Sequence, residues 1–204
     1  MLEESPESIV ALAGEWSSSV TMEIADRILR YFRRLLEWNV RVNLTGARSI
    51  ADLVGDHLPD SFALSQFVPL GSRVLDVGSG GGLPGIPFSI LREDCQVTLV
   101  EPRAKRVAFL NTAVREFCCG NATVVRARLE DFVSLDFGVA TSRATFRAQE
   151  WFRSGFSVLA PGGRLVLLST EKFSPGIGDK RLIDWAEYRT ASGVMRWAGC
   201  FCST

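Results

Sequence analysis

The pattern of apolar and polar positions divides the chain into a helical N-terminal part and a longer part in which short strands alternate with helices. From Met22 to Val40, apolar residues recur at spacings of three and four, which is typical of an amphipathic helix. A second helical stretch is predicted from Ser49 to Phe67, with an interruption at Pro59. We therefore expect an N-terminal helical appendage over residues 1–70.

Short β-rich runs follow in residues 71–204, and helical stretches separate them. The predicted strands are Arg73–Val77, Gln96–Glu101, Ala122–Arg126, Gly138–Thr141 and Arg164–Ser169. The predicted helices are Leu83–Leu91, Arg103–Phe117, Glu130–Val133 and Arg147–Leu159, and the tail adds an antiparallel pair, Trp185–Tyr188 with Val194–Phe201. Repeated strand, helix, strand units predict an α/β fold, in which a mostly parallel central sheet carries helices on both faces.

Composition indicates an ordinary globular protein. Hydrophobic residues make up 47% and charged residues 23% of the chain, and no apolar run approaches the ~20 residues that cross a bilayer. Acidic residues stand near the start, where a secretory signal would carry basic ones, so we expect a cytoplasmic protein. Five cysteines without paired spacing and a single histidine, His57, predict reduced thiols and no metal site. A formal net charge of +0 argues against a generic, strongly basic nucleic-acid binder.

A glycine-rich segment, VLDVGSGGGLPGIP, begins in the first predicted strand and carries the strongest chemical signal. No lysine follows its glycines, so it is not a phosphate-binding loop of the P-loop type. A dinucleotide-binding fingerprint also fits poorly, because its third glycine would fall on Leu83. The spacing Asp76-x-Gly78-x-Gly80-x-Gly82 fits instead the strand-to-helix turn of S-adenosylmethionine-dependent methyltransferases, in which the methionine end of the cofactor lies against bare backbone.

An acid follows at the end of the next predicted strand. Glu101 stands where such a methyltransferase needs a carboxylate that accepts both ribose hydroxyls of the cofactor. Because ligands of open α/β sheets bind at the carboxyl ends of the strands, the glycine loop and Glu101 should face one crevice. Asp76 is expected to receive the cofactor's ammonium group, and Leu129 and Glu130 are expected near the adenine. An acidic helix start explains the last two residues equally well.

Several longer motifs extend this similarity over most of the chain. They are WNVRVNLT, HLPDS, LDVGSGGGLPGIPFSI, EPRAKRVAFL and SRA. In these motifs the chain resembles the RsmG (glucose-inhibited division protein B) methyltransferases, which methylate guanine N7 in the decoding-region loop of 16S ribosomal RNA. The resemblance implies a Rossmann-like class I methyltransferase fold, S-adenosyl-L-methionine as cofactor with S-adenosyl-L-homocysteine as product, and 16S rRNA or the small ribosomal subunit as partner. We expect a monomer.

The expected site residues come from the glycine loop and from the ends of the strands beside it. The cofactor-binding residues are Asp76, Gly78, Ser79, Gly80, Gly82, Leu83, Glu101, Leu129, Glu130 and Arg143. Arg143 is also the expected catalytic residue, which would hydrogen-bond the guanine edge or a neighbouring phosphate. An ion pair with Glu150 or Asp131 is the structural alternative for Arg143. Guanine N7 offers an unprotonated lone pair, so no general base is expected.

Some positions depart from the family's pattern or allow two interpretations. The family usually has Arg or Lys where this chain has Asp56, and a lysine close to Ser169. A diverged member that acts on another substrate, such as a small molecule or a protein, or that serves as a non-enzymatic regulator, is therefore the alternative. His57 is expected to be structural. The basic residues of the first predicted helix either guide RNA phosphates or form a solvated face; they are Arg27, Arg30, Arg34 and Arg41.

Overall fold

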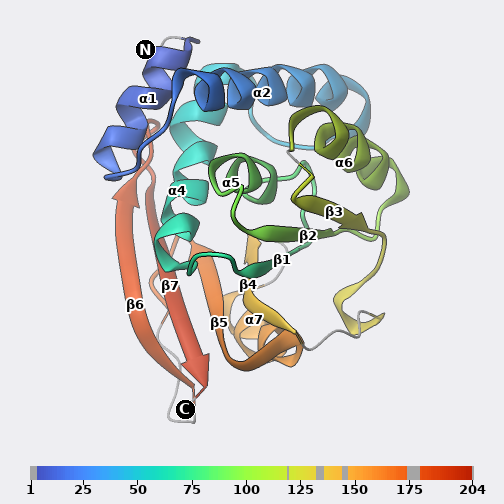
Figure 1. The fold of residues 1–204 in the computed structure, drawn as a ribbon, viewed down its shortest axis with the longest axis vertical. Coiled ribbons are helices and arrows are strands. Elements are labelled where there is room, and N and C mark those ends of the chain that lie inside the picture. The colour runs from blue at the N-terminus through green and yellow to red at the C-terminus, as the bar shows by residue number, and fades with distance from the viewer. Residues whose placement is uncertain (1–3, 119, 132–135, 144–146, 174–179, 204) are drawn as a thin grey trace.

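The described part of the chain is built around a single sheet. The computed structural model describes residues 4–118, 120–131, 136–143, 147–173 and 180–203. Its strands are β1 (Arg73–Val77), β2 (Gln96–Val100), β3 (Ala122–Val125), β4 (Phe137–Arg143), β5 (Leu159–Ser169), β6 (Lys180–Arg189) and β7 (Met195–Ser203). These described residues form a seven-stranded sheet of order β3-β2-β1-β4-β5-β7-β6, in which the first five strands pair in parallel (Figure 1). Strand β7 lies between β5 and β6 and is antiparallel to both; the tail pattern predicted the antiparallel pair of β6 with β7, but not its place in the sheet.

Helices cover both faces of the sheet, but unequally (Figure 1). They are α1 (Pro6–Glu15), α2 (Met22–Val42), α3 (Ile50–Asp52), α4 (Leu58–Phe67), α5 (Gly85–Leu91), α6 (Ala104–Phe117) and α7 (Ala148–Ser154), with the short turns η1 (Leu53–His57), η2 (Leu129–Asp131) and η3 (Gly155–Val158). Buried residues of α1 to α6 form one hydrophobic cluster with one sheet face, and α7 and η3 pack on the other. None of these described helices is long and apolar enough to cross a membrane. The predicted α/β fold is confirmed, whereas the boundary at residue 70 stays a prediction.

The central strands are buried on both faces, as parallel strands between two helical layers usually are. In β1, Val74 belongs to the cluster beneath α1 to α6, and Leu75 belongs to the cluster beneath α7. Because successive side chains of a strand point to opposite faces, Asp76 lies on the same side as Val74. This acid is therefore built into the face that most of the helices cover, one residue before the carboxyl end of β1.

The N-terminal part differs from its prediction in two places. The apolar spacing did not indicate α1, whose start is fixed by local chemistry: the N–H of Ser8 donates to Ser5 Oγ at 3.4 Å, and Pro6 occupies the first turn. The predicted break at Pro59 is a change of helix type. The π-helical turn η1 joins α3 to α4, and Pro59 follows it in the first turn of α4.

The fifth strand begins earlier than predicted, where a helix end was expected. Phe137 pairs with Leu159 and Val139 pairs with Arg164, so β5 carries extra residues at this point of the ladder. One of them is Gly162, whose φ of +75° suits glycine and few other residues. The regular pairing resumes at Arg164, which is the predicted start of the strand. A bulged beginning therefore explains why the sequence pattern showed only the second half of β5.

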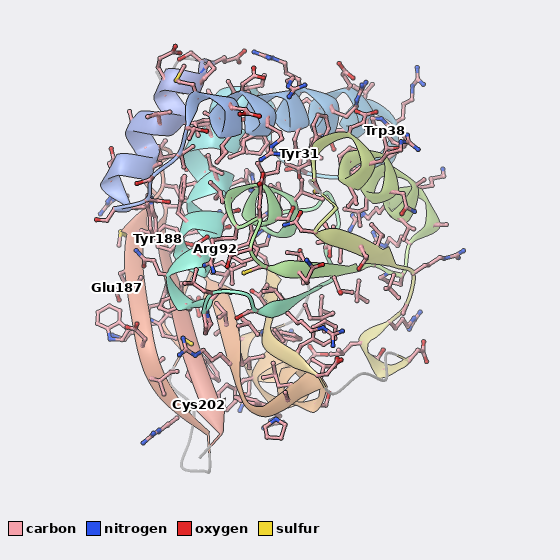
Figure 2. The ribbon with its side chains drawn as sticks, viewed as in Figure 1. Tyr31, Trp38, Arg92, Glu187, Tyr188 and Cys202 are labelled. Carbon is pink, nitrogen blue, oxygen red and sulfur yellow. The ribbon has the colours of Figure 1, made fainter. Side chains whose placement is uncertain are left out.

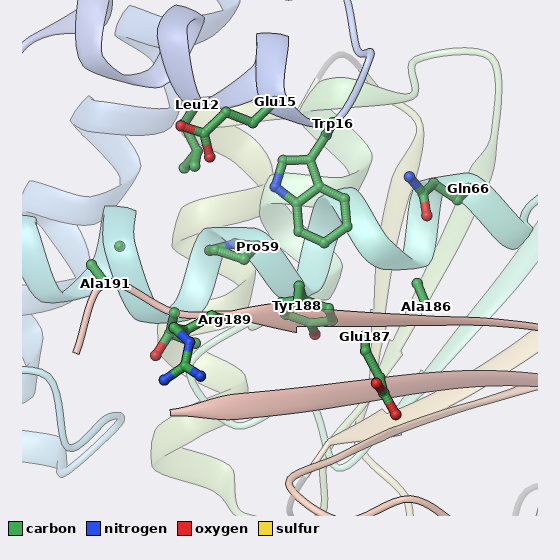
Figure 3. Close-up of a pocket in the computed structure, with 12 residues that line it drawn as sticks. Leu12, Glu15, Trp16, Pro59, Gln66, Ala186, Glu187, Tyr188, Arg189 and Ala191 are labelled. Carbon is green, nitrogen blue, oxygen red and sulfur yellow. The ribbon is translucent and has the colours of Figure 1, made fainter. Parts of the chain in front are cut away.

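A cavity of about 550 Å³ lies beside the edge strand β6, against α1 and α4 (Figure 3). The ring of Trp16 packs edge-on against Tyr188 there, with 4.9 Å between the ring centroids. Gly55 of η1 and Pro59 of α4 also line this cavity. This lining contains no residue of the glycine-rich segment, so the cavity is separate from the candidate site.

Candidate active site

The glycine-rich loop directly follows β1 and lies at the carboxyl edge of the sheet. The N–H groups of Gly78 and Ser79 both donate to the carbonyl of Val100, at 2.8 and 3.1 Å. Gly78, Gly80 and Gly82 have φ angles of +74°, +59° and +85°, a region that L side chains rarely adopt. At Gly82 a Cβ would also lie 2.5 Å from a side-chain carbon of α5. The loop therefore needs glycine for its conformation and, at Gly82, for space.

Glu101 joins the end of β2 to this loop. Its Oε2 accepts the N–H of Gly80 at 3.0 Å, and its Oε1 accepts the N–H of Arg103 at 2.9 Å. The guanidinium of Arg106 lies 3.8 Å from Oε2. Glu101 is 2% exposed, so these contacts replace water around the carboxylate. The structure thus brings together the loop and the acid that the sequence predicted to share one crevice.

Asp76 lies beneath the loop, close to the start of α5. A Cβ on Gly85 would lie 2.5 Å from Asp76 Oδ2, so the carboxylate and the helix start are in close contact. Oδ2 is buried and has no hydrogen-bond partner among the described residues. Burial raises the pKa of Asp76 to about 7, although the positive charge of Arg143 opposes this shift. The neighbouring predicted residues are also buried: Ser79, whose Oγ donates to the Asp76 carbonyl at 2.8 Å, and Leu83.

A cavity of about 190 Å³ opens beside the loop, at the carboxyl ends of β1 and β2. Its described lining is Val77, Gly78, Val100, Pro102, Ala127, Arg128, Leu129 and Glu130. Most of these side chains are aliphatic, which suits a flat aromatic ring. The predicted residues Leu129 and Glu130 therefore lie at one cavity with Gly78, on the turn η2. The predicted helical piece at this point extends to residues 132 and 133, which lie outside the described residues.

Tyr31 of α2 holds the outer side of the loop, and the sequence pattern did not indicate this role. Its hydroxyl donates to the carbonyl of Gly81 at 2.6 Å, and its side chain is fully buried. Figure 2 shows Tyr31 on the side of α2 that faces the rest of the molecule. Asn43, just after α2, accepts a hydrogen bond at its carbonyl from Arg106 at 3.3 Å. The N-terminal helices therefore contact the loop directly.

Arg143 ends β4 and bonds to α4 rather than to either predicted acid. Its Nη1 donates to Asp60 Oδ2 at 2.8 Å and lies 2.8 Å from His57 Nδ1. Asp60 is 0% exposed and also accepts the hydroxyl of Tyr188 and the guanidinium of Arg196, at 2.6 and 3.1 Å. A buried acid within the apolar run of α4 was the available sequence signal for this partner.

His57 belongs to the same cluster. Burial and the nearby Arg143 lower the pKa of His57 to about 4, so its ring is neutral at pH 7. A neutral ring 2.8 Å from Arg143 can accept its hydrogen bond, which agrees with the predicted structural role. Among the described residues, no group of three or more His, Cys, Asp or Glu side chains is arranged to bind a metal ion.

A second cavity, of about 230 Å³, lies at the carboxyl ends of β4 and β5. Arg143 and Arg196 line it together with Trp151 of α7 and Ser169 at the end of β5. The hydroxyl of Ser169 accepts the N–H of Glu171 at 3.0 Å, so this side chain also stabilises the turn after the strand. The predicted catalytic residue Arg143 therefore lines a cavity at the same edge of the sheet as the glycine loop.

Asp56, where the resemblance led us to expect a basic residue, has a structural partner in this chain. Its Oδ1 accepts the N–H of Ser192 at 2.9 Å, and the adjacent carbonyl of Gly55 accepts the N–H of Ala191 at 3.1 Å. Both partners lie in the turn between β6 and β7. A basic side chain could not accept the hydrogen bond from Ser192. In this chain the position fastens the C-terminal hairpin to η1.

The arginines of α2 are mostly paired with acids. Arg27 pairs with Glu93, and Arg34 pairs with Glu116 at 3.0 Å. Arg30 pairs with Asp26 within the same helix at 2.9 Å. Arg41 is exposed at the last turn of α2. These pairs favour a solvated helix face over a phosphate guide.

The family comparison agrees with this geometry. The sequence pattern of the GidB family, described as rRNA small subunit methyltransferase G, matches residues 24–177. A ribosomal RNA small subunit methyltransferase G from Xanthomonas campestris pv. campestris (strain B100) is 38% identical over 168 residues, which cover 80% of this chain and 77% of that protein. Its counterpart from Ralstonia nicotianae is 41% identical over 152 residues, which cover 70% of this chain and 68% of that protein.

Solved structures agree with the fold. The crystal structure of a SAM dependent methyltransferase from Aquifex aeolicus superimposes on this chain with a TM-score of 0.54. The matched residues cover 75% of this chain and 93% of that chain. Its sequence identity of 14% limits the likeness to the fold. The family pattern is more specific, because its matched range contains the glycine loop, Glu101, Asp60 and Arg143. By this match and by its identity to the curated relatives, the chain belongs to the GidB family, rRNA small subunit methyltransferase G.

Proposed function

We propose that the chain transfers a methyl group from S-adenosyl-L-methionine to guanine N7 in the decoding-region loop of 16S ribosomal RNA. Family membership supports methyl transfer to small-subunit rRNA. The observation that carries the proposal is the joining of the glycine loop to Glu101 at the carboxyl edge of the sheet. The cavity of about 190 Å³ opens beside that junction. We also propose that the chain acts as a monomer in the cytoplasm, where its substrate would be 16S rRNA or the small subunit.

The residues at this edge fit the cofactor. Each oxygen of Glu101 accepts one backbone N–H, so each keeps a lone pair that a ribose hydroxyl can use. Asp76 Oδ2 is buried without a partner among the described residues, and an ammonium group would satisfy it. The aliphatic cavity beside Gly78 fits an adenine ring, with Leu129 and Glu130 at its rim. The proposed cofactor site also includes Ser79, Gly80, Gly82, Leu83 and Arg143.

The proposed reaction requires positioning rather than proton removal. When bound, the cofactor supplies a methyl group on a positively charged sulfonium. Guanine N7 carries a lone pair at neutral pH, so no side chain has to act as a general base. Glu101 and the glycine loop would fix one reactant, and Arg143 would orient the guanine or its phosphate. Asp60 holds Arg143 in place at 2.8 Å, so Arg143 enters the reaction already oriented.

The test is to incubate the purified chain with labelled S-adenosyl-L-methionine and undermethylated small subunits, and then to map the labelled base. The proposal predicts label on one guanine N7 of the decoding-region loop. Fully methylated subunits serve as the control and should take up no label. A chain that binds the cofactor but labels another molecule, or none, would support a diverged member with a different substrate or a regulatory role.

A further inference from the structure

A second arginine stands at the cavity that Arg143 lines. Arg196 belongs to β7, whose pairing with β5 places Trp197 opposite Ser169. Both arginines line the cavity of about 230 Å³ at the carboxyl ends of β4 and β5. The two guanidinium groups reach the same oxygen, Asp60 Oδ2, at 2.8 and 3.1 Å. The antiparallel hairpin thus adds a cation to the edge of the parallel sheet.

Arg143 and Arg196 are the charged side chains in the described lining of this cavity. Both guanidinium groups pair with one carboxylate, that of Asp60. His57 is neutral at pH 7, because burial and Arg143 lower its pKa to about 4. Tyr188 donates its hydroxyl to Asp60, and burial raises its pKa above the ordinary value, so it stays neutral too. The described lining of the cavity contains no carboxylate. The charged groups that a ligand in this cavity would meet are therefore positive.

Arg196 also has an unused donor. Its Nε is buried and has no hydrogen-bond partner among the described residues. An unpaired buried donor of a charged group is unfavourable, so the present position of this guanidinium is not fixed by a full set of hydrogen bonds. The side chains of Arg196 and Arg143 keep 19% and 14% of their surface exposed, so a ligand in the cavity can reach both.

We propose that Arg196 and Arg143 together bind a phosphate group of the RNA backbone in this cavity, next to the nucleotide that is methylated. This inference rests on the proposed function, because it assumes that RNA enters at the carboxyl edge of the sheet. Guanidinium groups match phosphate oxygens in charge and in forked geometry. Two guanidinium groups at one cavity favour a charged phosphate over the neutral edge of a base. In this arrangement Asp60 and the hairpin position the phosphate site, and the site fixes the register of the RNA.

The test compares Arg196→Gln with a matched control, Arg181→Gln. Arg181 is exposed near the start of β6, where it lies opposite Cys202 of β7. This end of the strands is away from the cavity, so Arg181→Gln removes the same charge without changing the cavity lining. Affinity for a fluorescent oligoribonucleotide with the decoding-loop sequence is measured by anisotropy over a range of salt concentrations. For Arg196→Gln we expect Kd to rise about tenfold or more at low salt, and the slope of log K against log salt to fall by about 1. Arg181→Gln should match the unsubstituted chain.

A variant that keeps the charge separates the effect of charge from that of the forked geometry. Arg196→Lys keeps the charge, so it should restore the salt slope while regaining only part of the affinity. The inference is overturned if Arg196→Gln and Arg181→Gln give the same Kd and slope, or if Arg196→Gln changes base preference at an unchanged slope. Cofactor affinity, measured by calorimetry, should be equal in all variants and shows that each is folded. If the unsubstituted chain binds this RNA but methylates no small subunit, the proposed function fails while the comparison still decides the role of Arg196.

Discussion

Replacing Tyr31 by phenylalanine removes a single hydroxyl that holds the glycine loop. The hydroxyl donates to the Gly81 carbonyl at 2.6 Å, and the side chain is 0% exposed. Burial raises the pKa of Tyr31 well above its ordinary value, so the donor stays protonated at any working pH. The variant leaves a buried carbonyl without its donor, which costs about 1–3 kcal/mol in the free energy of unfolding.

The loss should reach the cofactor site, because Gly81 lies within the loop. A Cβ on Gly81 would lie 3.0 Å from Leu35 and 3.1 Å from the carbonyl of Leu44, so α2 and the segment after it pack tightly on this residue. Without the Tyr31 bond, the loop loses one of its fixed points. If about 1 kcal/mol of the loss falls on the loop conformation that binds the cofactor, the cofactor Kd rises about fivefold.

Tyr188→Phe is the matched control for this variant. It removes the same hydroxyl from another buried tyrosine, whose bond of 2.6 Å goes to Asp60 instead of the loop. Chemical denaturation should show a similar loss of stability for both variants, whereas calorimetry should show weaker cofactor binding only for Tyr31→Phe. A normal cofactor Kd for Tyr31→Phe, or an equal rise in both variants, would refute the proposed link between α2 and the loop.

Three further predictions concern the candidate site. Gly82→Ala should lower the melting temperature and weaken cofactor binding, because φ is +85° and the added Cβ would lie 2.5 Å from α5. The pKa of Asp76 is raised from 3.8 to about 7, so the native state keeps a proton that the unfolded chain has lost. Stability should therefore fall, and cofactor affinity rise, as pH increases towards 7, and Asp76→Asn should flatten both pH profiles. Arg143→Ala should lower rRNA turnover at least tenfold even at saturating labelled cofactor, measured in a filter assay; normal turnover would discard its catalytic role.

The local sequence pattern was sufficient to predict much of the fold. The predicted β1 has the observed bounds, Arg73–Val77, because a buried parallel strand bounded by turn residues is distinct in sequence. The amphipathic spacing placed α2 within two residues of its observed end at Val42. The glycine spacing and Glu101 were found together, because strand ends of a parallel sheet share one edge. These features depend on residues close in sequence or on a general rule of the fold.

The contacts that complete the site could not be found in this way. Tyr31 meets Gly81 across 50 residues, and Arg143 meets Asp60 across 83 residues. Apolar periodicity places Tyr31 on the buried side of a helix, but it does not say which carbonyl its hydroxyl meets. Likewise, Arg196 reaches the cavity only because β7 pairs with β5. Each depends on tertiary packing, which one sequence without a structure does not determine.

Calorimetric titration of the folded chain with S-adenosyl-L-methionine tests the central claim most directly. The claim is that the glycine loop and Glu101 bind the cofactor at the carboxyl edge of the sheet. It predicts saturable binding by the unsubstituted chain and binding at least tenfold weaker for Glu101→Gln, because an amide has one acceptor oxygen in place of two. Glu150→Gln, an exposed position on α7, should bind normally. No heat with the folded chain, or equal binding by Glu101→Gln, would contradict the account.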